Sequence, residues 1–179
     1  AGNVIGGGDW AIDRIVPDCM QAWSSGRVVD IRSPQATRPW QHVLEPLSGY
    51  LTLADSLAQS DVKHGEAYNF GPSADVNYPV SELINEMSKF WDQVQWRDVS
   101  TSKNHFHEAG LLKLNCDKVL FDLNWKPTLR FEETVKMTVE WYKNYYQNHE
   151  CSMFDLTISQ IDQYTKLAKS RGITWENND

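Results

Sequence analysis

The sequence predicts a helix-rich α/β fold in which a few short strands accompany a series of amphipathic helices. Apolar residues recur at helical spacing over several long windows, whereas the β-like runs are only a few residues long. These runs do not build the βαβαβ unit that a complete dinucleotide-binding sheet requires. With 179 residues and 41% apolar side chains, the chain suits one domain with a buried core.

Two helices and several short strands are expected in the first half of the chain. The first helix has Pro17 near its start and Gly26 as its stop signal. Its inner face would hold Ile12, Ile15, Val16, Cys19 and Trp23. β-like runs follow at 28–31, 41–43 and 67–70, and a second helix is predicted over about 44–58. The inner stripe of that helix would consist of Leu44, Leu47, Leu51, Ala54 and Ala58.

Helices dominate the second half of the chain. Their spacing predicts them over 80–91, 116–123 and 131–146, with a strand over 94–99 and Ser81 as a helix cap. The last helix has its start signal at Thr157, which would form a capping box with Gln160. Gly172 is its expected end, behind basic residues that suit the negative end of the helix dipole.

Composition narrows the class of ligand and the cellular setting. The net charge of −7 disfavours a general nucleic-acid binder, because such proteins neutralise phosphates with many Lys and Arg. A phosphate ligand would instead be held by a few placed cations. Cys19, Cys116 and Cys151 form neither a disulfide framework nor a metal pattern. No signal peptide or membrane-spanning apolar run is visible, so we expect a reducing, cytoplasmic setting.

A glycine-rich motif near the N-terminus has two interpretations. Gly6-Gly7-Gly8-Asp9-Trp10-Ala11 matches the dinucleotide fingerprint G-x-G-x-x-A, with Asp30 at about the right distance downstream. That fingerprint must open a helix, so that the pyrophosphate meets the helix N-terminus. Pro17 interrupts the helical pattern, and bulky Trp10 stands where the backbone should approach phosphate. The sequence therefore favours a flexible turn over a cofactor loop.

The segment from Arg32 to Arg38, stiffened by prolines, is a candidate phosphate site. Guanidinium groups form bidentate, charge-assisted hydrogen bonds with phosphate. Pairing of these arginines with surface carboxylates is an equally good interpretation of the pattern. Asn69 lies in an otherwise apolar run and must find a partner if it is buried, either backbone or a ligand phosphate.

His105, His107 and Glu108 form the one cluster that suggests a metal site. Two histidines at alternate positions lie on one face of a strand, but a closed site needs a further ligand, for which only Cys116 is nearby. A solvated loop is the favoured interpretation, and we predict no metal. Glu108 would then be a hydrogen-bond acceptor for a substrate.

Two motifs give the sequence a family resemblance. Gly-Gly-Gly-Asp-Trp at 6–10 and Thr-Arg-Pro-Trp-Gln-His-Val at 37–43 together resemble the CDP-glucose 4,6-dehydratases, which are extended short-chain dehydrogenases/reductases. Residues 1–10 are similar to the segment that follows the catalytic Tyr-x-x-x-Lys region in that family. Further matching stretches lie at 14–18, 31–34, 36–50, 68–72, 107–109, 112–114, 123–127 and 138–142.

The resemblance implies an enzyme that converts CDP-glucose to CDP-4-keto-6-deoxyglucose. Tightly bound NAD oxidises the sugar at C4, water is eliminated across C5 and C6, and the hydride returns to C6. The matched positions are Asn3, Arg38 and Asn69 for the diphosphate, Arg32 and Glu108 for the nucleotide or sugar, and Gly2 and Val4 near the nicotinamide.

Two motifs of the family are absent from these residues. The Thr-Gly-x-x-Gly-x-x-Gly cofactor loop and the Tyr-x-x-x-Lys pair do not occur in the sequence. We therefore expect residues 1–179 to be the C-terminal nucleotide-sugar-binding domain of an extended Rossmann-type dehydratase, without its N-terminal NAD-binding domain. Such a chain would be inactive alone, because nothing would deprotonate the C4 hydroxyl. The full-length enzyme would be a homodimer.

Two other functions stay open. The chain could belong to a sister dehydratase or epimerase that uses another nucleotide. It could also be a non-catalytic sugar-nucleotide-binding or assembly module. If a cofactor domain is missing, a face with Val4, Ile5 and Phe70 should be exposed and favour self-association.

Overall fold

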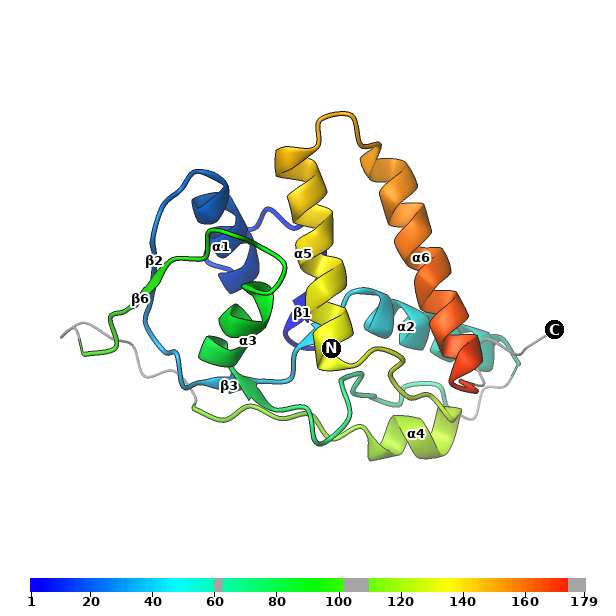
Figure 1. Ribbon diagram of the computed structural model, residues 1–179. Helices are drawn as coiled ribbons and strands as arrows, with labels where there is room; N and C mark the ends of the chain where they lie inside the picture. Colours follow the sequence, from blue (N-terminus) through cyan, green and yellow to red (C-terminus); the bar gives the residue numbers. More distant parts are fainter. Residues whose placement is uncertain (60–62, 102–109, 174–179) are drawn as a thin grey trace.

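The computed structural model describes residues 1–59, 63–101 and 110–173, and its helices gather around the long helix α5 (Figure 1). The helices are α1 (Ile15–Ser24), α2 (Leu44–Gln59), α3 (Val80–Met87), α4 (Asp117–Leu123), α5 (Phe131–Gln147) and α6 (Met153–Ser170). The strands are β1 (Val4–Ile5), β2 (Val29–Ile31), β3 (Thr37–Arg38), β4 (Gln41–His42), β5 (Tyr78–Pro79) and β6 (Trp96–Asp98).

The strands pair in twos within the described residues. β1 runs parallel to β4, so that Val4 lies beside Gln41 and Ile5 beside His42. β2 runs parallel to β6, and β3 is antiparallel to β5. The prediction of a helix-rich α/β fold is confirmed, and no complete parallel sheet exists in the described part of the chain.

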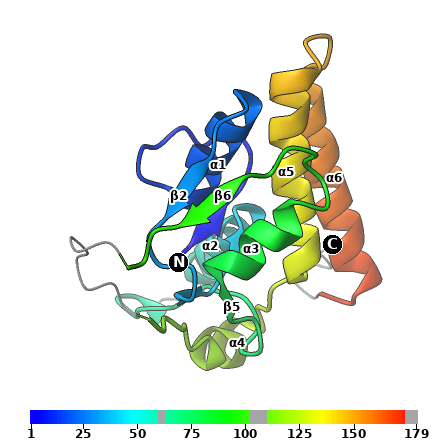
Figure 2. The ribbon, with the colours of Figure 1, turned by 60° about the vertical axis from the view of Figure 1, so that its left-hand side comes forward.

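The main core lies where α1, α3 and α5 meet β1 and β2. Leu83, Ile84 and Met87 of α3 are at most 1% exposed, because their spacing puts them on one face of the helix. They share an apolar cluster with residues of α1 and α5, among them Trp23 and Tyr142. Figure 2 shows β2 and β6 side by side next to α1, and α6 running alongside α5.

A buried carboxylate joins α2 to the rest of the molecule. Glu45 is 1% exposed, and it accepts hydrogen bonds from the backbone N–H groups of Thr128 (3.0 and 2.9 Å) and Leu129 (2.6 Å). It also accepts one from the Tyr164 hydroxyl of α6 at 2.9 Å. Ser48 lies within 3.0 Å of both the Tyr164 hydroxyl and the Trp125 indole nitrogen. α2 is thus held through polar contacts.

The predicted inner stripe of α2 is wrong, although the extent of the helix is right. Leu47 is 46% exposed and Leu51 is 72% exposed. The buried face of the helix instead carries Glu45, Pro46, Ser48 and Gly49. The hydrogen-bond network of Glu45, together with Gly49 packed against Phe70, determines which side of α2 faces the core.

Several expected boundaries also differ from the structure. α6 begins one turn before Thr157, because Ser152 is the N-cap and accepts from the Asp155 N–H at 3.2 Å. α3 begins after Pro79, so Ser81 does not cap it. Ile12 precedes α1 and is 86% exposed. Residues 67–70 form no strand.

The residues predicted to end the helices are confirmed. Gly26 and Gly172 follow the ends of α1 and α6 with φ of +66° and +62°, a backbone conformation that glycine adopts without a steric cost. Asn124 ends α4 in the same left-handed region, at φ +51°. At these positions the residue type alone was therefore enough to predict where a helix ends.

The expected exposed face is also corrected. Ile5 is 7% exposed and Phe70 is 2% exposed, because the chain's own helices cover them. The large apolar side chains that do reach the surface include Leu47, Tyr50 and Leu51 on α2.

Candidate functional site

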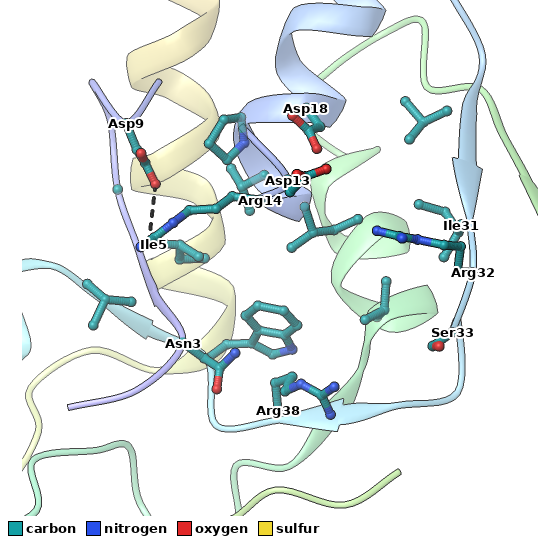
Figure 3. Close-up of a pocket in the computed structure, with 18 of the residues that line it drawn as sticks. Asn3, Ile5, Asp9, Asp13, Arg14, Asp18, Ile31, Arg32, Ser33 and Arg38 are labelled. Carbon is teal, nitrogen blue, oxygen red and sulfur yellow. Dashed lines mark ion pairs between the residues drawn. The ribbon is translucent and has the colours of Figure 1, made fainter. Parts of the chain in front are cut away.

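A cavity of about 450 Å³ opens between β1, the start of α1, β2 and β3. Its polar lining includes Asn3, Asp13, Arg14, Asp18, Arg32 and Arg38. Figure 3 shows Asn3 and Arg38 together at one end and Asp13 and Asp18 at the other, with Arg32 pointing inward from the β2 side. The cavity therefore has both cationic and anionic groups facing one space.

Asn3 is held at the cavity by the β1–β4 pairing. Its backbone is left-handed, with φ +52°, a conformation that Asn tolerates better than most residues. The Asn3 carbonyl accepts from the Gln41 N–H at 3.3 Å. The side-chain amide of Gln41 donates to the carbonyls of Gly2 (3.0 Å) and Phe70 (2.9 Å). The buried Gln41 thus fixes the segment that carries Asn3.

Arg38 is almost fully buried, with 8% of its surface exposed, yet its guanidinium faces the cavity. It donates to the Thr37 carbonyl at 2.8 Å. β3 is held in place by its pairing with β5 and by Trp40, whose indole donates to the Tyr78 carbonyl at 3.0 Å. A positioned, permanently charged guanidinium of this kind suits a phosphate.

Two further arginines complete the cationic lining. Arg32 follows β2, which is tied to β6 by the ion pair between Asp30 and Arg97 at 2.7 Å. Arg14 precedes α1 and forms a 3.6 Å ion pair with Asp9. Sequence reasoning did not select Arg14; its place just before the Ile-Val-Pro start of a helix, eleven residues after Asn3, was the available signal.

The opposite end of the cavity is acidic. Burial raises the pKa of the Asp18 carboxyl, and Asp13 raises it further, whereas Arg32 lowers it. The lining as a whole holds four carboxylates, those of Asp9, Asp13, Asp18 and Asp30, and the same cavity is faced by three arginines. Their number suits a diphosphate better than it suits nucleic acid.

The other predicted site residues lie elsewhere or outside the described part. Val4 lines the cavity, and Gly2 is next to Asn3. Asn69 is exposed, is not among the lining residues, and donates to the Asn115 carbonyl at 3.2 Å. Glu108, together with His105 and His107, lies outside the described residues.

The glycine motif forms a loop and does not open a helix, since α1 begins only at Ile15. A Cβ on Gly7 would stand 2.0 Å from the Trp141 ring, so Gly7 is needed for close packing against α5. Trp10 packs on the same helix, with its ring centroid 4.8 Å from that of Tyr145. The favoured interpretation as a turn agrees with this geometry. The motif closes the cavity wall through Asp9 and places no helix N-terminus toward a pyrophosphate.

Comparisons with known proteins define the class. No family model matches the sequence. The fold resembles UDP-glucuronic acid 4-epimerase from Bacillus cereus in complex with UDP-glucuronic acid and NAD, with a TM-score of 0.68 at 14% identity, over 80% of this chain and 44% of that one. It also resembles UDP-glucose 4-epimerase from Stenotrophomonas maltophila, with a TM-score of 0.66 at 16% identity, over 80% and 46%. Both structures are nucleotide-sugar epimerases, and at these identities the likeness shows that this chain shares their Rossmann-type fold.

Within that class, the sequence is related to CDP-glucose 4,6-dehydratase. It is 44% identical to the enzyme of Salmonella typhimurium over 144 residues, which is 80% of this chain and 40% of that protein. It is 25% identical to dTDP-glucose 4,6-dehydratase of Escherichia coli over 135 residues, 69% of this chain and 35% of that protein. The predicted family resemblance is confirmed, and the chain spans less than half the length of these relatives.

The described helices include none that is long and apolar enough to cross a membrane.

Proposed function

We propose that this chain is the nucleotide-sugar-binding part of an NAD-dependent CDP-glucose 4,6-dehydratase. The observation that carries the proposal is the single cavity that brings Asn3, Arg32 and Arg38 together in an acidic protein related to that enzyme. The parent enzyme would convert CDP-glucose to CDP-4-keto-6-deoxyglucose in the biosynthesis of a deoxysugar.

The positions of Arg38 and Arg32 in the cavity support a specific role for each. The Arg38 guanidinium, buried and aimed into the cavity beside Asn3, would bind the diphosphate. Arg32, on the β2 side, would contact the nucleotide. Asn69 and Glu108 stay predicted contacts with the phosphate and with the nucleotide or sugar.

NAD would be bound mainly outside these 179 residues. The residues present do not form a cofactor cradle of their own, because the glycine motif leads into a loop. Val4, which lines the cavity on β1, and Gly2, two residues before it, are the proposed backbone next to the nicotinamide. When bound, the cofactor would accept and return the hydride. The residues of this chain would hold the sugar against the cofactor.

The first experiment is isothermal titration calorimetry of the chain with CDP-, dTDP-, UDP- and GDP-glucose. We expect measurable binding with CDP-glucose preferred. A preference for dTDP-glucose or a UDP-sugar would favour the related dehydratases or epimerases, which the matches at 25% identity and the epimerase structures keep open. Binding of none of the four would contradict the proposal.

Turnover is a separate test. The purified 179-residue chain should not convert CDP-glucose, because it has no Tyr-x-x-x-Lys pair to remove the C4 hydroxyl proton. Formation of a 4-keto sugar by the chain alone, detected by the absorbance of that product in base, would contradict this expectation.

The homodimer expected of the whole enzyme also remains a prediction.

A further inference from the structure

We propose that Asp18 and Arg32 recognise the nucleotide base in this cavity, and that the Asp18 carboxylate selects cytosine over uracil and thymine. The inference rests on the proposed function, since it takes a sugar nucleotide as the ligand. It adds the group that distinguishes one nucleotide from another.

The two side chains approach the cavity from neighbouring walls. Asp18 lies in the first turn of α1, and Arg32 directly follows β2. Both line the cavity, and Figure 3 shows the Arg32 guanidinium pointing into the space on the side where Asp18 lies. Arg32 lowers the pKa of Asp18 against the effect of burial, so the two charges act on each other across this space.

Both groups are available to a ligand. In the described part of the chain, the Asp18 carboxylate accepts no hydrogen bond and the Arg32 guanidinium donates none, whereas Arg14 is paired with Asp9. Asp18 is half-buried, so its carboxylate has lost part of its hydration without gaining a protein donor. A donor on the ligand would repay that cost.

The direction of the ligand follows from the proposed chemistry. The sugar must face the nicotinamide, which places it on the β1 side, and the diphosphate lies with Asn3 and Arg38. The base is then left to the end of the cavity between α1 and β2. A carboxylate at this end repels phosphate, which also favours the base over the diphosphate there.

Asp18 and Arg32 match the hydrogen-bonding edge of cytosine. A carboxylate only accepts and a guanidinium only donates. Cytosine offers the N4 amino group as a donor beside the acceptors N3 and O2, whereas thymine and uracil carry the acceptor O4 at position 4. Asp18 can therefore bind cytosine N4–H while Arg32 donates to N3 or O2. With uracil, Asp18 would face O4, and two acceptors would be left without a proton between them.

The test compares CDP, UDP and dTDP by calorimetry on the wild-type chain and on matched variants. The wild type should bind CDP at least about tenfold more tightly than UDP. Asp18→Asn should bring the two affinities close together, because the amide can present either its oxygen or its NH₂ to position 4. Asp18→Ala, which removes both the acceptor and the repulsion, should do the same and guards against an unstable first variant.

Asp13→Asn is the control. It removes the same charge from the same wall of the cavity, and Asn tolerates the left-handed backbone at position 13, where φ is +62°. It should keep the preference for CDP. Equal loss of the preference in both Asn variants would overturn the inference, since negative charge alone would then explain it.

The remaining outcomes separate the inference from the proposed function. If CDP-glucose is preferred and neither Asp18 variant changes the ratio of CDP to UDP affinity, the inference fails and the proposed function stands. Equal wild-type affinity for CDP and UDP overturns the inference directly. Binding of no sugar nucleotide at all overturns the proposed function itself.

Discussion

Arg38 is the side chain on which the proposed diphosphate site most depends. It is nearly buried on β3, and its orientation is set by backbone contacts at Thr37 and by strand pairing. A lysine would keep the charge and lose the planar fork that contacts two phosphate oxygens together.

Arg38→Lys is therefore expected to weaken binding of CDP-glucose by about 10- to 100-fold, the loss of one or two charge-assisted hydrogen bonds. Calorimetry gives the dissociation constants. Arg97→Lys is the matched control, because Arg97 is 68% exposed and is not among the residues that line the cavity. Equal weakening by both variants would show that Arg38 has no special role.

His42 provides a pH-dependent prediction. It is 2% exposed on β4, and burial lowers its pKa from 6.5 to about 4. Its Nδ1 accepts from the Leu44 N–H at 3.3 Å. In the folded chain His42 stays neutral down to about pH 4, whereas in the unfolded chain it binds a proton below about pH 6.5.

The depressed pKa means that this contribution to stability is present above pH 6.5 and is lost as the pH falls toward 4. The full difference is about 3 kcal/mol, at 1.36 kcal/mol per pKa unit. Urea denaturation at several pH values should show less of this dependence in His42→Asn, which keeps an acceptor. The exposed His64→Asn should retain the dependence; an unchanged pH profile in His42→Asn would contradict the assignment.

At the scale of the element, α2 shows why a helix can be predicted correctly while the face that it buries is predicted wrongly. Leu47, Leu51 and Ala54 form a regular apolar stripe, and hydropathy alone points it inward. The inward face is instead defined by Glu45 and Ser48, whose partners lie more than 70 residues away in the chain. No local pattern reports such distant hydrogen bonds, so the orientation could not be predicted from the sequence.

Glu45→Gln should destabilise the fold by about 2–4 kcal/mol, because the amide replaces one of the two acceptor oxygens with an NH₂ group, and each oxygen accepts from a backbone N–H. Urea denaturation measures the loss. Glu140→Gln, at an exposed helical pair 3.7 Å from Lys136, should change stability by less than about 0.5 kcal/mol. Similar midpoints for both variants would mean that the Glu45 network does not hold α2.

The candidate site also combines features that a local sequence pattern predicts with features that depend on distant parts of the chain. The Arg32–Arg38 segment was recognisable because arginines and prolines adjoin each other in the sequence. Asn3 and Arg38 share a cavity because β1 pairs with β4, and no spacing in the sequence predicts that pairing; only the family resemblance assigned both residues to the diphosphate. Arg14 and Asp18 were missed because a charged residue at a helix start is ordinary, and only the folded cavity distinguishes them.

At the scale of the whole molecule, the exposed apolar face of α2 is the feature that needs an explanation. The chain spans 40% of the length of its Salmonella relative, so a large part of that enzyme has no counterpart here. On α2, Leu47, Tyr50 and Leu51 present a solvent-exposed apolar surface. We expect the isolated chain to pair this face with the same face of a second copy.

Sedimentation velocity over a range of concentrations should show this association, and Leu51→Glu should reduce it by placing a charge on the most exposed of these apolar side chains. Leu120→Glu is the control, since Leu120 is 47% exposed and belongs to α4, not to the apolar face of α2. A monomer at all concentrations in the wild type would contradict the prediction, as would equal effects of the two substitutions.

The cavity is assembled from a nearly continuous piece of chain. Among its described lining residues, all but Val80 fall between residues 3 and 40. A bound nucleotide would therefore bridge the successive turns of one short segment, and would leave α4 and α6 largely untouched. Amide hydrogen exchange should slow on ligand binding mainly in the first forty residues, since binding suppresses local opening there. Because the lining comes almost entirely from one segment, we expect nucleotide selectivity to be transferable with it. Exchanging residues 3–40 between related dehydratases should exchange the nucleotide that each one prefers.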